Sequence, residues 1–368
     1  MKKYIILIIG ISIYVFVMIG QGRVPIEALA TISGIGYDIE EKGEDIIEYS
    51  IPINTNVYKS SGTQENILFN AQGQSLGEIA QKRQEKMDKK FVQGQEEIVL
   101  ISEDYAKYGL KTLIEDRFRN PETNNRANMA VCKGKAEDYL KYQKKGYTNS
   151  SEYIQGLIEY YSKYSFFSNE YQLINAYVRI GAEGRCLVLP YIELTEEGIE
   201  ITGMAIFKNG KMVQFVDIQK SKILNILKND NVRGILSLQN SSKEYIDFDA
   251  TSKKRKVKCY KQGDKYSFII DLTFTGSVIN NEMYADIMNN LNKKIEFEKD
   301  MEKSIEKQCD DFIKTMKNNY KIDCLSLGRE AAAKYGRQKS IDWNEVVSNA
   351  DIKVNVKVTA DLQGRGDY

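Results

Sequence analysis

The residue types that usually carry enzyme chemistry are sparse in this chain. None of its 368 residues is histidine, which is the usual general base, the partner of Ser and Cys nucleophiles and the commonest zinc ligand. Paired Asp or Glu residues remain as acid–base candidates, although a sequence does not give the separation of two carboxylates. We therefore expect a non-enzymatic protein with no catalytic residues, no metal and no cofactor, and keep an acid–base enzyme as an alternative.

The five cysteines, Cys132, Cys186, Cys259, Cys309 and Cys324, are scattered singly with no C-x-x-C pair. This spacing is typical of small buried apolar side chains rather than of a metal site or a disulfide framework. The disulfide state of Cys309 and Cys324 stays open, because these two meet only if the chain doubles back between them.

An uncharged apolar run, YIILIIGISIYVFVMIG, occupies residues 4–20 behind Lys2 and Lys3. As a helix it spans about 25 Å, slightly less than the roughly 30 Å hydrocarbon core of a bilayer. Residues 1–22 are therefore predicted to be a secretory signal or, alternatively, a short membrane anchor, since a buried core helix would need an amphipathic pattern. Lysines before the run place the residues after it on the outer side of a membrane.

Position 21 bears on lipid attachment. A lipoprotein signal ends in a small residue followed by the Cys that takes the lipid, whereas here Gly20 is followed by Gln21. Because Gln21 has no thiol, we predict no lipid attachment at this position. The small-x-small sequence Gly20-Gln21-Gly22 suits an ordinary signal peptidase, so cleavage and retention of the leader both stay open.

The remainder has the composition of folded domains that face water. Apolar residues make up 42%, charged residues 28%, and the formal net charge is +1; the length suggests two or three domains. A nucleic-acid-binding protein would need a clear positive excess, so we predict no nucleic-acid partner. The dense basic run at residues 253–256 is predicted to be the solvated edge of a strand.

Strand and helix patterns alternate in the N-terminal region, residues 23–197, which is typical of an α/β layer. Gly34-x-Gly36 lacks the third glycine and the following helix of a nucleotide-binding turn. Ser75-x-x-Glu78 is a capping box that opens a polar helix reaching about residue 90. Ser102 is predicted to cap the next helix.

Tyrosines and phenylalanines crowd between residues 150 and 177. The helical spacing of Ile154, Leu157, Ile158 and Tyr161 predicts a helix-pair core, with a ligand cage as the alternative. After this cluster, the sequence TEEG at residues 195–198 is predicted to link the N-terminal region to a C-terminal domain at residues 198–368.

The C-terminal domain has its own patterns. Asn209-Gly210 lies between two strand patterns and predicts a hairpin. Alternation over residues 266–274 and 352–360 predicts two strands, and an apolar stripe over residues 283–318 predicts a long helix on a sheet. The predicted fold is α+β and multi-domain, with mixed sheets, packed helices and one long helix in the C-terminal half.

An ordered series of short motifs spans nearly all of the chain beyond the leader. The motifs are IEALATISGIGYD at 26–38, FVQGQEEIVLISEDYAKYGL at 91–110, RFRNPE at 117–122, CKGKA at 132–136, LPY at 189–191, GMAIFK at 203–208, RGILSL at 233–238 and IDCLSLG at 322–328, followed by Lys334-Tyr335, Trp343 and the closing alternating strand. In this order and spacing, the chain resembles the C subunits of spore germinant receptors, the Ger(x)C family.

This resemblance implies a non-enzymatic subunit of a nutrient-sensing complex, on the outer face of the inner membrane of a bacterial spore. It implies integral membrane subunits of A and B type as partners, and a three-domain α+β architecture. The family transfers no catalytic residues. The chain departs from the family pattern in two places: Gln21 stands at the usual lipobox Cys, and Gln95 stands where a His is expected.

Two residues are nominated as partner contacts. Arg233 and Trp343 are chosen because arginine and tryptophan are the commonest interface anchors. The alternatives are a turn-closing role for Arg233 and plain core packing for Trp343. For the whole chain, the alternative function is an extracytoplasmic solute-binding protein, which the aromatic cluster and the two-part outer region motivate.

Overall fold

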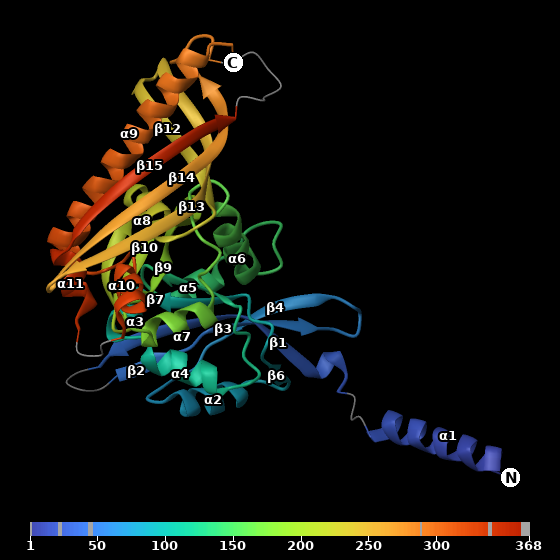
Figure 1. Ribbon diagram of the computed structural model, residues 1–368. Helices are drawn as coiled ribbons and strands as arrows, with labels where there is room; N and C mark the ends of the chain where they lie inside the picture. The colour runs from blue at the N-terminus through green and yellow to red at the C-terminus, as the bar shows by residue number, and fades with distance from the viewer. Residues whose placement is uncertain (1, 21–23, 43–46, 288, 338–340, 362–368) are drawn as a thin grey trace.

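Two β-sheets and the helices that pack on them form the body of the protein (Figure 1). The computed structural model describes residues 2–20, 24–42, 47–287, 289–337 and 341–361. The predicted α+β fold with mixed sheets is confirmed in this part of the chain.

The larger sheet has the order β11-β10-β9-β8-β7-β1-β2-β5, with β3 and β6 also pairing with β1, and β4 pairing with β3. Its centre is parallel, from β1 through β7 and β8 to β9, and β10 and β11 continue it antiparallel. The strands are β1 Leu29–Glu41, β2 Ile47–Ser50, β3 Ile53–Tyr58, β4 Gln64–Phe69, β5 Gln72–Gly73, β6 Lys90–Val92, β7 Ile98–Ser102, β8 Asn128–Cys132, β9 Val188–Thr195, β10 Gly198–Lys208 and β11 Lys211–Asp217.

Helices connect these strands, and two of them begin as predicted. Ser75 Oγ accepts from the Glu78 N–H at 3.2 Å, and Ser102 Oγ accepts from the Tyr105 N–H at 3.2 Å. The helix after Ser75 is shorter than predicted, because residues 90–92 pair with β1 as a strand. The helices are α2 Leu76–Gln84, α3 Glu103–Tyr108, α4 Lys111–Arg119, α5 Ala136–Lys141, α6 Ser150–Tyr161, α7 Leu173–Gly181 and α8 Ile218–Lys228, with a 3-10 turn at Ile26–Ala28.

Gly34 and Gly36 lie inside β1, where neighbouring elements come very close. A Cβ on Gly34 would lie 2.1 Å from Ser151 Oγ, and one on Gly36 would lie 2.8 Å from Pro52 Cγ. These glycines therefore allow α5 and α6 to pack against the sheet, which explains their spacing without a nucleotide.

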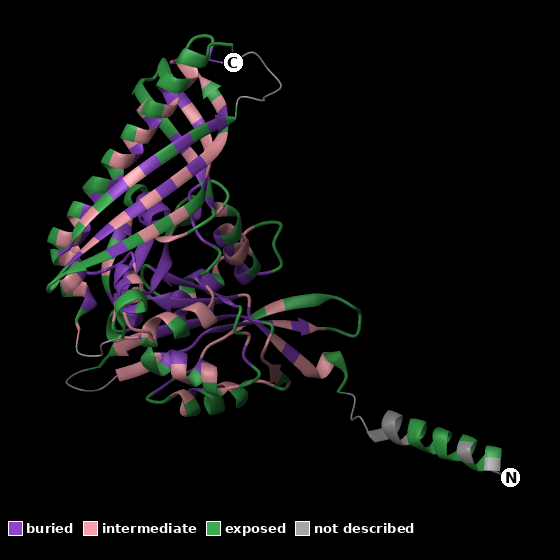
Figure 2. Ribbon diagram, in the orientation of Figure 1, coloured by how far each residue is buried: buried purple, intermediate pink, exposed green. Residues whose placement is uncertain are grey.

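The smaller sheet is formed by β12 Val232–Ser241, β13 Glu244–Gln262, β14 Lys265–Asn281 and β15 Asp351–Asp361, in that order. The predicted strands at 266–274 and 352–360 are confirmed within β14 and β15. Figure 2 shows buried residues alternating with more exposed ones along β14, as its burial pattern requires. The basic run at residues 253–256 lies on the part of β13 that extends past its pairing with β12.

The predicted long helix is α9 Leu291–Thr315, which runs along this sheet (Figure 1) and continues as a π-helical turn at Met316–Tyr320. It begins later than predicted, because Asn290 caps it and because Tyr284 and Ile287 are buried in the turns before it. Two further helices, α10 Leu327–Tyr335 and α11 Trp343–Asn349, lead to β15.

Residues 195–198, predicted to be a linker, instead form the tight turn between β9 and β10. The pairing Gly198↔Thr195 closes this antiparallel hairpin, so the larger sheet continues across the position. The hairpin predicted at Asn209-Gly210 is confirmed between β10 and β11, with both residues at positive φ. Both strands belong to the larger sheet, and the division of the chain into domains at 197/198 stays a prediction.

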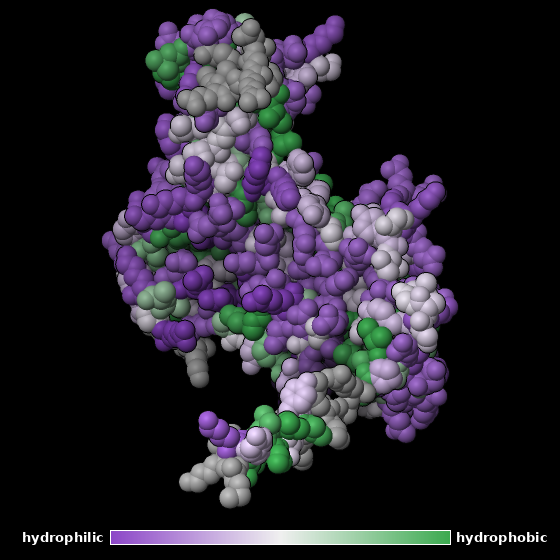
Figure 3. Space-filling model, turned by 90° about the vertical axis from the view of Figure 1, so that its right-hand side faces the viewer, coloured by the Kyte–Doolittle hydropathy of each residue, from purple (hydrophilic) through white to green (hydrophobic). Residues whose placement is uncertain are grey.

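The apolar leader forms the helix α1 Lys2–Gly20, which extends away from the body (Figure 1). Large apolar side chains such as Ile8 and Tyr14 are each 62% exposed. Figure 3 shows a largely hydrophilic face of the body, with hydrophobic residues on the leader below it. Over the described residues, no helix combines the length and apolar character that crossing a membrane requires. Gln21 lies outside the described residues.

Candidate functional site

The candidate site is the set of contacts that joins residues 164–187 to residues 233–235 and 323–343, which we call the seam. Both nominated partner contacts, Arg233 and Trp343, belong to it. They lie at different places along the seam, and no contact between them is recorded among the described residues.

At the first place, main-chain hydrogen bonds attach the loop at residues 164–166 to the edge strand β12. The Phe166 N–H donates to the Arg233 carbonyl at 2.8 Å, and the Ile235 N–H donates to the Tyr164 carbonyl at 3.1 Å. The Arg233 side chain points to solvent, 58% exposed, and its Nε donates to Asp249 Oδ1 at 2.9 Å. The Arg233 backbone thus joins the loop at residues 164–166 to β12, while its guanidinium stays exposed at the surface.

Gly234, which follows Arg233 in the motif at residues 233–238, allows close packing against the loop. A Cβ on Gly234 would lie 2.5 Å from the ring of Phe166, which is fully buried and contacts Phe274 edge-on. Phe166 itself has φ +60°, an unusual conformation for a residue with a side chain. The fit of Phe166 over Gly234 therefore fixes how the loop meets β12.

At the second place, Trp343 is 5% exposed and packs between neighbours. Its ring lies 5.6 Å from that of Tyr266, its Cβ lies 2.6 Å from where a Cβ on Gly328 would stand, and its Nε1 donates to Glu183 Oε1 at 2.9 Å. This burial supports the core interpretation of Trp343 and leaves it without the exposed surface that a partner contact needs.

The loop around Gly184 fits closely against the start of α10. Gly184 has φ +66°, and its carbonyl accepts from the Arg329 N–H at 3.0 Å. Asp323 caps the same helix start by accepting from the N–H groups of Leu327 and Gly328 at 2.9 and 2.7 Å. Burial raises the pKa of Asp323 to about 6. The motif at residues 322–328 therefore forms the cap and the close contact of the seam.

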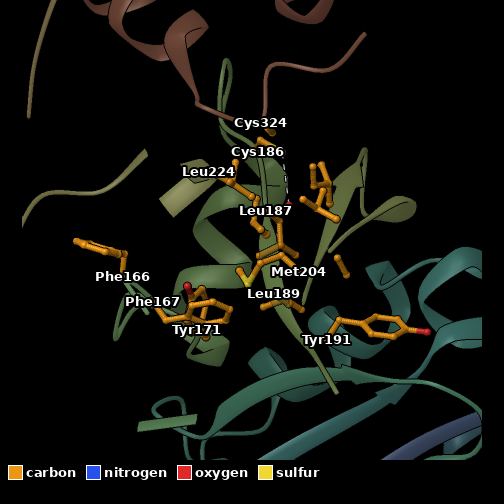
Figure 4. Close-up of a cluster of buried hydrophobic side chains, with 14 of the residues drawn as sticks. Phe166, Phe167, Tyr171, Cys186, Leu187, Leu189, Tyr191, Met204, Leu224 and Cys324 are labelled. Carbon is orange, nitrogen blue, oxygen red and sulfur yellow. Dashed lines mark hydrogen bonds between the residues drawn. The ribbon is translucent and has the colours of Figure 1, made fainter. Parts of the chain in front are cut away.

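The aromatic cluster divides between core and surface. Phe166, Phe167 and Tyr171 are buried, and Figure 4 shows them below Leu224 of α8 and beside Leu189 of β9. Tyr160 and Tyr164 are 62% and 63% exposed and belong to no ring pair among the described residues. Most of the cluster is thus core, as the helical spacing predicts, and it offers no enclosed cage of rings for a solute.

A buried ion pair joins two of the motifs that carry the family resemblance. Arg117 Nη2 donates to Glu96 Oε1 at 2.8 Å, with the two side chains 7% and 0% exposed. Glu96 Oε2 accepts from the N–H groups of Gly94 and Asn124 at 2.9 and 3.1 Å. This pair was not predicted from the sequence, because Glu96 and Arg117 lie in motifs that hold several other charged residues and nothing local marks these two as buried partners.

All five cysteines are buried and free, so Cys309 and Cys324 form no disulfide. Burial raises the pKa of the Cys186 thiol to about 11 and holds that of the Cys324 thiol well above its ordinary value. Within the described ranges, no group of three His, Cys, Asp or Glu side chains has the arrangement of a metal site. These thiols are packing groups of low reactivity.

The fold and the seam define a class of two-sheet α+β proteins, and comparison with known proteins identifies the family. Residues 22–194 match the family model described as the spore germination protein N-terminal domain, and residues 202–364 match the model for the spore germination B3/GerAC-like C-terminal domain. The chain therefore belongs to the GerAC-like family of spore germination proteins, which confirms the resemblance seen in its motifs.

A curated relative and a solved structure agree with this assignment. The chain is 24% identical to spore germination protein GerQC of Bacillus cereus, and the match covers 98% of each protein. The crystal structure of the GerBC protein has a TM-score of 0.57 at 15% identity, and the match covers 89% of this chain and 97% of that one. The latter similarity establishes the shared fold.

Proposed function

We propose that this protein is the non-enzymatic C subunit of a membrane-associated spore germinant receptor and supports germination triggered by nutrients. The observation that carries the proposal is the match of both germination-protein domain models, in order, over nearly the whole chain beyond the leader. The full-length similarity to GerQC supports the same role.

Further features support a binding role at the outer face of the spore inner membrane. The apolar leader behind two lysines suits export. The absence of histidine from the sequence suits a protein that binds neighbours rather than one that transfers protons. The partners we propose are the integral membrane subunits of A and B type from the same receptor, with exposed Arg233 as a contact residue.

Deletion of the gene tests this function. We expect spores of the deletion strain to lose their response to at least one nutrient germinant, and wild-type gene expressed in trans to restore it. A gene lacking the codons for residues 4–20 should fail to restore the response, because the product no longer reaches the membrane. A normal response of the deletion strain to every nutrient germinant would contradict the proposal.

A further inference from the structure

A polar cleft of about 470 Å³ opens beside the seam, between α7, the end of α8, β13 and the start of α10. Its basic lining residues are Arg179, Arg185, Lys228, Arg255 and Arg329, and its acidic lining residues are Glu170, Asp230 and Glu330. Positive charge therefore exceeds negative charge in the cleft.

Most of this positive charge is not neutralised by ion pairs. Arg179 pairs with Glu170. Across the described part of the chain, the side chains of Arg185 and Arg329 make no ion pair and no hydrogen bond. Arg185 comes directly after Gly184, whose carbonyl accepts from the Arg329 N–H at 3.0 Å. This hydrogen bond between Gly184 and Arg329 therefore brings Arg185 and Arg329, whose side chains make no ion pair within the described ranges, close together in the lining of the cleft.

The other two cations are bound only to uncharged oxygens. Lys228 Nζ donates to the carbonyls of Cys186 and Cys324 at 3.2 and 2.7 Å and to Ser326 Oγ at 3.1 Å. The Arg255 guanidinium donates to the carbonyls of Leu227 and Leu325. Neither side chain makes an ion pair with another described residue, and the carboxylates of Glu330, Asp230 and Asp323 act on Arg255 only at longer range. Partly buried cations without an ion-pair partner cost folding free energy, and an anion in the cleft would offset part of this cost.

The arginines that line the cleft also repel one another. Burial lowers the pKa of Arg185, and the neighbouring Arg329 and Arg179 lower it further. The same three arginines line an adjoining cleft of about 1140 Å³, where Arg337 adds a cation that has no ion pair among described residues. Five basic and three acidic side chains line this adjoining cleft, so positive charge is in excess in both clefts.

We propose that this cleft beside the seam binds a small oxyanion, either a phosphate or a carboxylate group. Guanidinium groups recognise both oxyanions through paired hydrogen bonds. Asp323 already accepts from the first N–H groups of α10, so side chains rather than the helix start hold the ligand. The proposal is independent of the receptor role, because it depends only on the charges and geometry of the cleft.

Calorimetric titration of the purified protein with inorganic phosphate, and separately with citrate, tests this site at matched ionic strength. We expect saturable binding of at least one of the two anions. The anion that binds more tightly identifies the ligand group as phosphate or carboxylate. Arg185→Gln and Arg329→Gln should each weaken binding by about tenfold. Lys243→Gln, which removes an exposed charge from the β12–β13 turn, should leave it unchanged.

Thermal unfolding shows whether each variant is folded before it is titrated. Binding that Arg185→Gln and Arg329→Gln leave at wild-type strength would overturn the assignment. So would the absence of saturable binding by both anions, or equal stabilisation of the protein by chloride at the same ionic strength.

Discussion

Glu302 on α9 accepts a hydrogen bond from the backbone N–H of Val358 on β15, at 3.0 Å. One turn to either side on the helix, Glu306 and Glu298 accept from the N–H groups of Val356 and Ala360 at 3.0 and 2.9 Å. In the described ranges, β15 is an edge strand and β14 is its one pairing partner. Three carboxylates therefore occupy the donors that would otherwise pair with a strand of another molecule.

Replacing all three glutamates by alanine exposes this edge. We expect a loss of about 3 kcal/mol in the free energy of unfolding, roughly 1 kcal/mol for each partly exposed hydrogen bond, together with self-association. Urea unfolding and light scattering measure the two effects. Glu296→Ala, Asp310→Ala and Asp311→Ala remove the same charge from exposed positions of α9 and should leave the protein monodisperse. Equal behaviour of the two triple variants would contradict this role for the carboxylates.

The buried pair of Glu96 and Arg117 is expected to matter far more than a surface pair. Glu96→Ala leaves the Arg117 charge buried without its partner, which should cost about 3–5 kcal/mol of unfolding free energy. Glu115→Ala removes an exposed carboxylate that lies 3.3 Å from Arg119 and 4.0 Å from Lys111, both exposed, and should cost less than about 1 kcal/mol. Urea unfolding compares the two. Similar losses would show that the buried pair is not a main support of the N-terminal region.

The contact between Gly234 and Phe166 predicts opposite outcomes for two glycine substitutions. Gly234→Ala should destabilise the protein by about 2–3 kcal/mol, because the new Cβ overlaps the Phe166 ring. Gly156→Ala, inside α6 with no atom within 4 Å of the new Cβ, should be neutral or stabilise by up to about 1 kcal/mol. Thermal unfolding measures both. A neutral Gly234→Ala would mean that the loop does not sit against β12 in this way.

Glu97, just before β7, should make stability depend on pH. Its Oε2 has no hydrogen-bond partner among the described residues. Burial, followed by repulsion from Glu152 and Glu159, raises its pKa from 4.5 to about 7. Because the folded state holds this proton more tightly than the unfolded chain does, the stabilisation is complete below about pH 4.5 and is lost as the pH rises to about 7.

Glu97→Gln removes that ionisation. After allowance for partial exposure, we expect it to stabilise the protein by about 1 kcal/mol at pH 8, or roughly 2–4 °C in Tm, and by less than half as much at pH 5. Thermal melts at the two pH values measure the difference, with Glu196→Gln in the exposed β9–β10 turn as the control. A gain no larger at pH 8 than at pH 5 would refute this explanation.

Features set by neighbouring residues were predictable from the sequence. The caps at Ser75 and Ser102, the Asn209-Gly210 hairpin and the alternation of β15 all depend on positions a few residues apart. The start of α9 was wrong by eight positions, 283 against 291, because packing rather than helical periodicity buries Tyr284 and Ile287.

Features set by distant residues were not predictable in the same way. The turn at residues 195–198 resembles a linker until β9 and β10 are seen to pair. Trp343 is buried because Tyr266 and Gly328 meet it there. The cation cluster escapes notice because Arg185, Lys228 and Arg329 lie far apart in the sequence and outside the quoted motifs. Each depends on contacts that local patterns do not encode.

Purification of the tagged full-length protein from detergent-solubilised spore membranes tests the proposed receptor role most directly. We expect multispan membrane subunits of the receptor to co-elute with it, and Arg233→Glu to reduce their recovery while leaving the fold intact. Recovery of the wild-type chain from these membranes without membrane subunits, or its presence in the cytosolic fraction alone, would contradict the assignment of this protein as a receptor subunit.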